Sequence, residues 1–541
     1  MSHRKSSRSA PRLTRRRGAL GSVLVVTLCV LALLAVPGSA AAGARTAPQS
    51  GGSALVALEQ ATLTAGDAAA GDSLGYSVAL DGNTALVGAY NATAGATGSA
   101  GAAYVFTRTG STWTQQQKLT ASDAATGDQF GLSVALVGDT AVIGADGKTV
   151  DGDTSAGAVY VFTRTGTTWT QQQKLTASDE AIGDQFGWSV AVAGDTAVIG
   201  ADYKSVAGNT DAGAAYVFTR TGTTWTQQQR LTAADGAAED LFGNSVAVAG
   251  DTAVVGAEFK TVSTDLGAGA AYVFTRSGTT WTQQQKLTAA DAASSDNFGS
   301  AVALSGDTAL VGAAHKFVSG SSVAGAAYVY TRTGTTWTSQ ATLHAGDVGQ
   351  NDQFGHSVSL SGNTALIGAP GKTVSGAGGV GAAYVFGRSG THWTQQTRMT
   401  ASDGATLDNF GWSVSLSGTT ALAGAWQKTV GANLNAGAAY VDMLNPAPSL
   451  SLKAAPRSVK VGSSVALSGA VSHAIAGVKT VNICRKVGSK LTRLKQLKIT
   501  KSGAFKWSLT PKKAGKWVLV ATYKFGRTTF MSKTVTVTVK K

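Results

Sequence analysis

The sequence has few of the residues on which covalent frameworks and most enzyme sites depend. Only 2 of its 541 residues are cysteine, which excludes a disulfide framework. Its histidines form no His-x-His or His-Glu-x-x-His cluster, so metal and triad chemistry have no starting point. Charged residues make up 14% of the chain and hydrophobic residues 43%, the reverse of a disordered composition. We therefore expect a folded protein that is not an enzyme.

Three structural classes are also excluded by what is missing. No long stretch has a 3.6-residue hydrophobic period, so helix is essentially absent. The 68 glycines do not recur at every third residue, which excludes collagen. Beyond residue 44 there is no run of 18 apolar residues, so we expect no membrane span.

The first 44 residues have the pattern of a signal peptide. Seven basic residues precede an apolar run over 19–36, and small residues suited to cleavage follow it. We expect residues 1–44 to be removed, residues 45–54 to form a linker, and the protein to be extracellular, either secreted or associated with the cell envelope.

The middle of the chain is an internal repeat. One tyrosine within a Gly-Ala-Ala-Tyr-Val type of segment marks seven copies at a constant spacing of 56 residues: Tyr104, Tyr160, Tyr216, Tyr272, Tyr328, Tyr384 and Tyr440. In the second copy, residues 132–137, 140–144, 158–164 and 168–175 read as four short strands. Gly138-Asp139 between the first two suits a two-residue II′ turn.

Seven four-stranded units predict an all-β, seven-bladed β-propeller. The last copy lacks its fourth strand, whereas residues 55–64 supply that strand's pattern before the first copy. We expect this N-terminal strand to complete the last blade and close the ring over residues 55–445, because an open ring would expose two strand edges.

The repeats also carry a family resemblance. Phe354-Gly355 followed by Gly368-Ala369-Pro370 is an FG-GAP sequence, and most other copies contain Phe-Gly and Gly-Ala at the same spacing. The array resembles the FG-GAP β-propellers, whose best-known members are the head domains of integrin α-chains. The resemblance implies an extracellular propeller used for adhesion or ligand recognition, with an extracellular protein or glycan as its ligand.

The chain departs from this family at the hairpins that bind Ca²⁺ in many FG-GAP blades. Here the first two strands of a blade are joined only by pairs such as Gly82-Asn83 and Gly138-Asp139. Two residues cannot supply the six to eight oxygen ligands that Ca²⁺ prefers. We expect no Ca²⁺ at these hairpins and no other cofactor or metal.

Copies differ most in the loop that follows Gly-Ala. Its first position holds Tyr90, Asp146, Asp202, Glu258, Ala314, Pro370 and Trp426. Since a shared scaffold most economically varies its contacts in loops, we predict that Tyr90, Asp146, Asp202, Glu258 and Trp426 bind the ligand. Neutral drift in a solvent-exposed loop is the alternative.

Two further functions stay open beside adhesion to a protein. A multivalent, lectin-like propeller would use residues kept in the blades, such as the tryptophans at Trp113, Trp169, Trp225, Trp281, Trp337 and Trp393. Tryptophans of this kind more often pack between blades. A purely structural envelope module is the third option.

The end of the chain differs sharply in charge from the repeats. Residues 51–445 contain 17 Lys and Arg and 30 Asp and Glu, a net charge of −13, whereas residues 446–541 contain 20 Lys and Arg and no acid. After a linker at 446–448, alternating strands over 449–541 predict an Ig-like β-sandwich, similar to small modules of bacterial surface proteins. We expect this basic domain to bind an anionic cell-envelope polymer and not nucleic acid, because no nucleic-acid motif is present.

Overall fold

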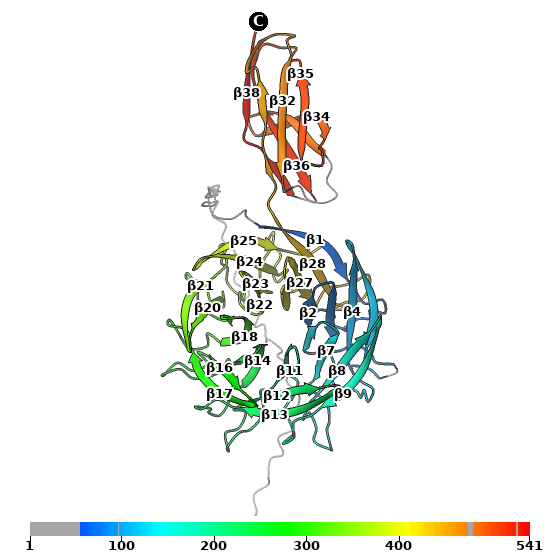
Figure 1. Cartoon of the computed structure of the whole chain (residues 1–541), viewed down its shortest axis with the longest axis vertical. Helices are drawn as coiled ribbons and strands as arrows, with labels where there is room; N and C mark the ends of the chain where they lie inside the picture. The colour runs from blue at the N-terminus through cyan, green and yellow to red at the C-terminus, as the bar shows by residue number, and fades with distance from the viewer. Residues whose placement is uncertain (1–54, 96, 474–479, 526–527) are drawn as a thin grey trace, which may run out of the picture. The chain divides into compact units, whose positions relative to one another are not determined.

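The computed structural model describes residues 55–95, 97–473, 480–525 and 528–541, and all its regular structure in these ranges is β-strand. The predicted signal peptide and the linker at 45–54 lie outside the described residues. In the part described, no helix is long and apolar enough to cross a membrane. Residues 55–446 form a closed ring of seven four-stranded sheets, which confirms the predicted propeller (Figure 1).

Each blade is an antiparallel sheet whose strands follow one another in the chain. The first strands are β2 (Ser77–Asp81), β6 (Val134–Val137), β10 (Ser189–Ala193), β14 (Phe242–Ala249), β18 (Phe298–Ser305), β22 (Val358–Ser361) and β26 (Val414–Ser417). The second strands are β3 (Thr84–Ala89), β7 (Thr140–Ala145), β11 (Thr196–Ala201), β15 (Thr252–Ala257), β19 (Thr308–Ala313), β23 (Thr364–Ala369) and β27 (Thr420–Ala425).

The outer half of each blade has a longer pair of strands. The third strands are β4 (Ala102–Thr109), β8 (Ala158–Thr165), β12 (Ala214–Thr221), β16 (Ala270–Ser277), β20 (Ala326–Thr333), β24 (Ala382–Ser389) and β28 (Ala438–Pro446). The fourth strands are β5 (Thr112–Leu119), β9 (Thr168–Leu175), β13 (Thr224–Leu231), β17 (Thr280–Leu287), β21 (Thr336–Leu343), β25 (His392–Met399) and, from the N-terminus, β1 (Leu55–Leu63).

Ring closure by the N-terminal strand is confirmed. β1 pairs antiparallel with β28 from Leu55↔Pro446 to Leu63↔Ala439, so the last sheet has the order β1-β28-β27-β26. β28 continues to Pro446, one residue into the predicted linker. In Figure 1 the blue β1 lies beside β28, which joins the two ends of the propeller.

Turn chemistry sets the register within each blade. Gly138 has φ of +55° at the first position of the Val137↔Thr140 hairpin, which is what a II′ turn requires and what glycine adopts without strain. The Arg164 guanidinium bonds the Oδ1 atom of the next turn residue, Asp139, at 2.7 Å. The hairpin carboxylate is thus engaged with arginine.

The blades pack through the residues that recur every 56 positions. Phe186 is fully buried and contacts the rings of Tyr216 and Phe218, with centroids 5.5 and 5.9 Å away. Trp225 is also buried, and its indole nitrogen donates to Gln172 Oε1 of the preceding blade at 3.2 Å. Ser133 Oγ donates to the carbonyl of Gly187 in the next blade at 2.7 Å. These repeated residues therefore hold neighbouring blades together.

A buried ion pair fixes the long loops of six blades. In the second blade Lys148 Nζ lies 2.8 Å from Asp128, and both residues are buried. Asp128 also accepts the backbone N–H of Ala125, as expected for a turn aspartate. The first blade has Ala92 in place of the lysine. Equivalent pairs join Lys204–Asp184, Lys260–Asp240, Lys316–Asp296, Lys372–Asp352 and Lys428–Asp408.

Strand direction gives the propeller two different faces. Because successive strands are antiparallel, the two-residue turns after the first and third strands lie at one end of each blade. The long loops after the second and fourth strands lie at the other end. In the first two blades these long loops cover residues 90–101 and 120–133. We call this side the loop face.

Residues 449–541 form two sheets around one apolar core. The smaller sheet contains β29 (Ser449–Leu450), β30 (Lys453–Ala455), β32 (Val465–Ser472) and β35 (Ala504–Leu509). The larger contains β31 (Ser458–Lys460), β33 (Thr480–Val487), β34 (Lys490–Lys498), β36 (Gly515–Phe525), β37 (Thr528–Met531) and β38 (Val535–Lys540). Assignment of these two sheets to an Ig-like fold stays a prediction.

Candidate ligand site on the loop face

Two positions in each blade define an inner rim on the loop face. The first follows Phe-Gly (Leu-Gly in the first blade) and lies before or within the start of the first strand, and the second follows the second strand. Since the first strand of each blade contacts the first strands of the blades beside it, these positions encircle the centre of the ring. The first set is Tyr76, Leu132, Trp188, Asn244, Ser300, His356 and Trp412; the second is Tyr90, Asp146, Asp202, Glu258, Ala314, Pro370 and Trp426.

One arc of the inner rim is acidic. Asp146 and Asp202 follow β7 and β11, and their exposed fractions are only 4% and 1%. Burial raises the pKa of Asp146 and of Glu258 to about 7. Burial also raises the pKa of Asp202 well above its ordinary value, with the negative charges of Asp146 and Glu258 adding to the effect. These neighbouring acids therefore resist ionising together unless a cation neutralises them.

The adjoining arc is aromatic. Tyr76 lies against Tyr90, with ring centroids 4.5 Å apart, and also contacts Trp412 and Trp426 at 5.5 and 5.9 Å. The rings of Trp412 and Trp426 are 5.4 Å apart. These contacts join side chains of the first and last blades across the point of ring closure. They form a connected aromatic surface at one side of the inner rim.

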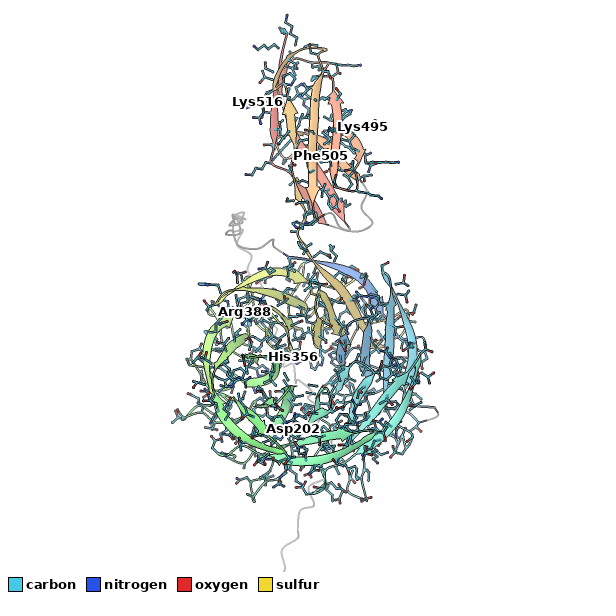
Figure 2. The ribbon with its side chains drawn as sticks, in the orientation of Figure 1. Asp202, His356, Arg388, Lys495, Phe505 and Lys516 are labelled. Carbon is cyan, nitrogen blue, oxygen red and sulfur yellow. The ribbon has the colours of Figure 1, made fainter. Side chains whose placement is uncertain are left out.

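His356 extends this surface into the sixth blade. Its ring centroid is 4.2 Å from that of Trp412, and its Nδ1 atom lies 3.0 Å from the Trp412 carbonyl oxygen. Burial lowers the pKa of His356 to about 4, so the imidazole is neutral at pH 7. Figure 2 shows Asp202 and His356 within the ring of blades, on different arcs.

Unpartnered polar atoms gather at this same end of the propeller. Buried side-chain atoms without a hydrogen-bond partner are rare in folded proteins, because each costs about 1–3 kcal/mol. Among the described propeller residues such atoms occur only on or beside the inner rim: Asp146 Oδ1, Gln185 Oε1, Asp202 Oδ1, Asn244 Oδ1, Ser300 Oγ, Asn409 Oδ1 and Trp426 Nε1. The rim thus offers polar groups whose hydrogen bonds the fold itself leaves unmade.

Exposed apolar side chains surround the rim. Every strongly exposed large hydrophobic residue in the described part of the propeller lies in a long loop of the loop face: Ile182, Tyr203, Phe259, Leu266, Phe317, Leu407 and Leu434. Since apolar groups gathered on one face are typical of contact surfaces, the loop face and not the turn face is suited to recognition.

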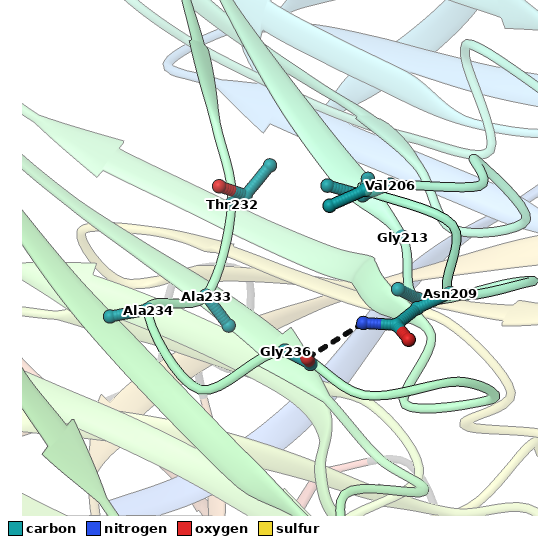
Figure 3. Close-up of a pocket in the computed structure, with 9 residues that line it drawn as sticks. Val206, Asn209, Gly213, Thr232, Ala233, Ala234 and Gly236 are labelled. Atoms are coloured by element: carbon teal, nitrogen blue, oxygen red, sulfur yellow. Dashed lines mark hydrogen bonds between the residues drawn. The ribbon is translucent and has the colours of Figure 1, made fainter.

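A small hollow lies farther out in the third blade. It has a volume of about 200 Å³ and is bounded by the two long loops, including Val206 and Thr232 (Figure 3). Asn209 Nδ2 donates across it to the Gly236 carbonyl oxygen at 3.2 Å. None of the residues that line it is charged, so this hollow offers no ionic contact to a ligand.

Comparison with known families agrees with this architecture. The FG-GAP repeat profile matches seven segments: 58–106, 113–162, 169–218, 225–274, 281–330, 337–386 and 393–441. The chain belongs to the FG-GAP repeat family. No curated protein matches the sequence. In this FG-GAP protein the matched segments end within β28, so the family assignment concerns the propeller and not the basic tail.

The structure brings all five predicted ligand residues onto the inner rim. Trp426 and Tyr90 both contact Tyr76, while Asp146, Asp202 and Glu258 make up the acidic arc. Sequence analysis missed the first rim set, which includes Tyr76, His356 and Trp412. These residues carried a usable signal, because they differ between copies next to the repeated Phe-Gly just as the second set does next to Gly-Ala.

Other sequence expectations concern the repeated tryptophans and the metal sites. Trp113, Trp169, Trp225, Trp281 and Trp337 have exposed fractions of 9% or less, so these five pack between blades and present no face to a sugar. Trp393, the sixth, is only partly buried. Among the residues that the structure describes, no group of three or more His, Cys, Asp or Glu side chains is arranged to hold a metal ion.

Proposed function

We propose that this FG-GAP protein is an exported, non-enzymatic binding protein whose loop face recognises an extracellular protein. The observation that carries the proposal is the divided inner rim, with buried carboxylates on one arc and contacting, mutually tilted aromatic rings on the other. A scaffold that needed only to be stable would not keep unpartnered carboxylate oxygens buried, because each one lowers stability.

The two arcs together favour a cationic side chain as the central contact. A lysine or arginine head satisfies buried carboxylates by charge and hydrogen bonding, and aromatic faces attract the same cation through their electron density. The exposed apolar residues of the outer loops would pack around it, as the polar and apolar parts of a protein interface commonly do. The partner is therefore a protein that presents a lysine or arginine among apolar side chains.

A displayed random-peptide library, panned at pH 7.5 on the full chain, tests this proposal. We expect enriched peptides to contain lysine or arginine, and we expect Asp202→Asn and Trp426→Ala to abolish the enrichment. Asp139→Asn is the matched control, since Asp139 lies on the turn face. Enrichment of acidic or uncharged peptides, or equal enrichment by the Asp202→Asn variant, would contradict the proposal.

A glycan array probed with the same proteins tests the lectin alternative. Buried repeated tryptophans disfavour one sugar pocket per blade, but the rings of Trp412 and Trp426 are partly exposed at the rim. Binding to a defined sugar that Trp412→Ala removes would favour glycan recognition at this single site. If neither peptides nor glycans bind, the purely structural envelope module becomes the better explanation.

A further inference from the structure

The basic tail, residues 446–541, carries a high positive charge that plays no part in the proposed ligand site of the propeller. Of its Lys and Arg residues, 18 are described and 17 of these are exposed. Arg485 is the exception, and its guanidinium stacks over the Trp517 ring at 4.3 Å. Because the tail contains no Asp or Glu, none of this charge is neutralised by an acid within the tail itself.

Strand register shows which of these cations share a face. In the larger sheet, the odd-numbered residues of β33, β36 and β38 form the core, as the burial of Ile483, Leu519 and Val537 shows. Since side chains alternate along a strand, the even-numbered residues of these strands point away from the core. Lys486, Lys516 and Lys540 are therefore on the outer face, and Figure 2 shows Lys516 on the outside of the tail.

Cross-strand pairs extend this face to both edges of the sheet. On β34, Arg493 pairs with Cys484 and Lys498 pairs with Thr480, so both lie on the same side as Lys486. On β31, Lys460 pairs with Lys540. We call the resulting set the outer basic face: Lys460, Lys486, Arg493, Lys498, Lys516, Lys524 and Lys540.

The outer basic face also contains a shallow apolar groove. It has a volume of about 270 Å³, with the buried Val520 among its lining residues. Leu491 and Met531 line it while remaining 37% and 60% exposed, and Lys486 lies in the same lining. The face thus combines separate positive charges with apolar surface between them.

We propose that the outer basic face binds a linear anionic polymer of the cell envelope, built from sugar or polyol units joined by phosphodiesters. Lysine, which predominates on this face, binds phosphate as a point charge and needs no fixed geometry, which suits a flexible polymer. The carbon skeleton of each unit would lie against the apolar groove. This inference is independent of the ligand site on the propeller.

Nucleic acid fits the face less well. Proteins that bind single strands stack bases on aromatic side chains. The outward positions of the described strands hold Val518, Val520, Thr522, Thr536 and Thr538, and the tryptophan of β36, Trp517, is on the core side with Leu519. The face offers charge attraction, but it has no aromatic side chains for stacking bases and no element that would contact base edges. These features favour a polymer of simple repeating anions.

The test measures binding of the full chain to poly(glycerol phosphate) across a series of NaCl concentrations. One variant combines Lys486→Gln, Arg493→Gln and Lys498→Gln on the outer basic face. The matched control combines Lys453→Gln, Lys506→Gln and Lys513→Gln, which removes the same charge from exposed residues elsewhere on the tail. All six residues are exposed, and an unchanged thermal midpoint verifies that both variants fold.

We expect the outer-face variant to bind at least 10-fold more weakly and the control variant at most about 3-fold more weakly. The slope of log Kd against log[NaCl] should fall by up to about three for the outer-face variant, in proportion to the number of phosphates that its side chains no longer neutralise. Equal losses of affinity in the two variants would overturn the site. Absence of polymer binding, or tighter binding to duplex DNA under the same conditions, would overturn the polymer class.

Discussion

At the scale of single residues, the packing of each blade depends on a few side chains that occupy equivalent positions in all seven blades. Phe186 has no exposed surface, and the core around it includes Val142 and Val161 of the preceding blade. One substitution there removes packing within a blade and between two blades. The first blade has Leu74 at this position and still buries it completely, so the site requires volume more than aromaticity.

We predict that Phe186→Ala lowers the free energy of unfolding by about 3–5 kcal/mol, because it leaves a cavity between two blades. Denaturant unfolding measures the loss. Ile182→Ala in the adjacent loop is the control, and it should change stability by no more than about 0.5 kcal/mol because Ile182 is 67% exposed. A loss below about 1 kcal/mol for Phe186→Ala would contradict the packing described here.

The acidic arc leads to a second prediction, which concerns how the free energy of unfolding depends on pH. The pKa of Asp146 is about 7 in the fold, raised by burial from an ordinary 3.8. A carboxyl with a raised folded pKa is protonated in the folded state and ionised in the unfolded state between these values. Its stabilising contribution is full below about pH 4 and is lost as pH rises towards 7. We therefore expect the protein to unfold more easily at pH 8 than at pH 5.

Replacing the carboxyl tests this origin directly. Asp146→Asn should raise the free energy of unfolding at pH 8 by roughly 2 kcal/mol and flatten its decline between pH 5 and pH 8. Part of the decline should persist, since burial also raises the pKa of Glu258 and of Asp442 to about 7. The exposed Asp151→Asn serves as control, and an identical pH profile for both variants would argue against the raised pKa.

At the scale of elements, β1 is the strand whose role was most visible in the sequence. Its pattern matched the strand missing from the last copy, and the ladder from Leu55↔Pro446 to Leu63↔Ala439 places it there. Turns were equally predictable, since glycine at a position such as 138 meets the positive φ that the hairpin needs. Features of this kind depend on residues that are adjacent in the sequence, so they can be predicted without a structure.

Deleting residues 55–64 should destabilise the propeller more than Phe186→Ala does. The deletion exposes the edge of β28 and removes the apolar contacts of Leu63, which is buried in the core between the last and first blades. Thermal unfolding monitored by circular dichroism measures the effect, and size-exclusion chromatography should show self-association through the open edge. A monomeric protein that melts like the intact chain would refute ring closure by this strand.

The roles of other residues could not be predicted from the sequence, because these roles depend on contacts between segments far apart in the chain. Tyr76 and Trp412 belong to the first and last blades, and only closure of the ring brings them within 5.5 Å. Lys148 recurs in six blades, but its partner Asp128 lies 20 residues earlier, at the far end of another loop. In the tail, Arg493 and Lys495 are two residues apart, yet a bulge at Ile483/Cys484 sends them to opposite faces.

At the scale of the whole molecule, the constant and the variable parts of the propeller repeat lie at opposite ends of the blades. Tight turns at one end need little sequence variation, so that end repeats faithfully and sets the register of every blade. Long loops at the other end are anchored by buried pairs such as Lys204–Asp184, which leaves the rim residues between them free to differ. A regular repeat can therefore present a rim that differs from blade to blade.

A circular permutant distinguishes the two interactions that close the ring, which are the β1–β28 ladder and the side-chain packing between the first and last blades. Leu55 pairs with Pro446, so a two-residue turn can join the end of β28 directly to β1, as in the other blades. Moving residues 55–63 behind residue 446, with the tail attached after them through a flexible linker, gives seven complete blades and no shared one. Blade packing is retained, but the last blade is no longer tied to both chain ends.

We expect this permutant to fold, with a thermal midpoint several degrees below that of the natural order. Parting the first and last blades would then break side-chain packing alone, whereas in the natural order it also requires the β1–β28 ladder to separate. Peptide binding at the rim should survive, because Tyr76, Trp412 and Trp426 still meet across the same junction. A permutant as stable as the natural chain would show that packing alone closes the ring, and one that fails to fold would show that the shared blade is needed to form it.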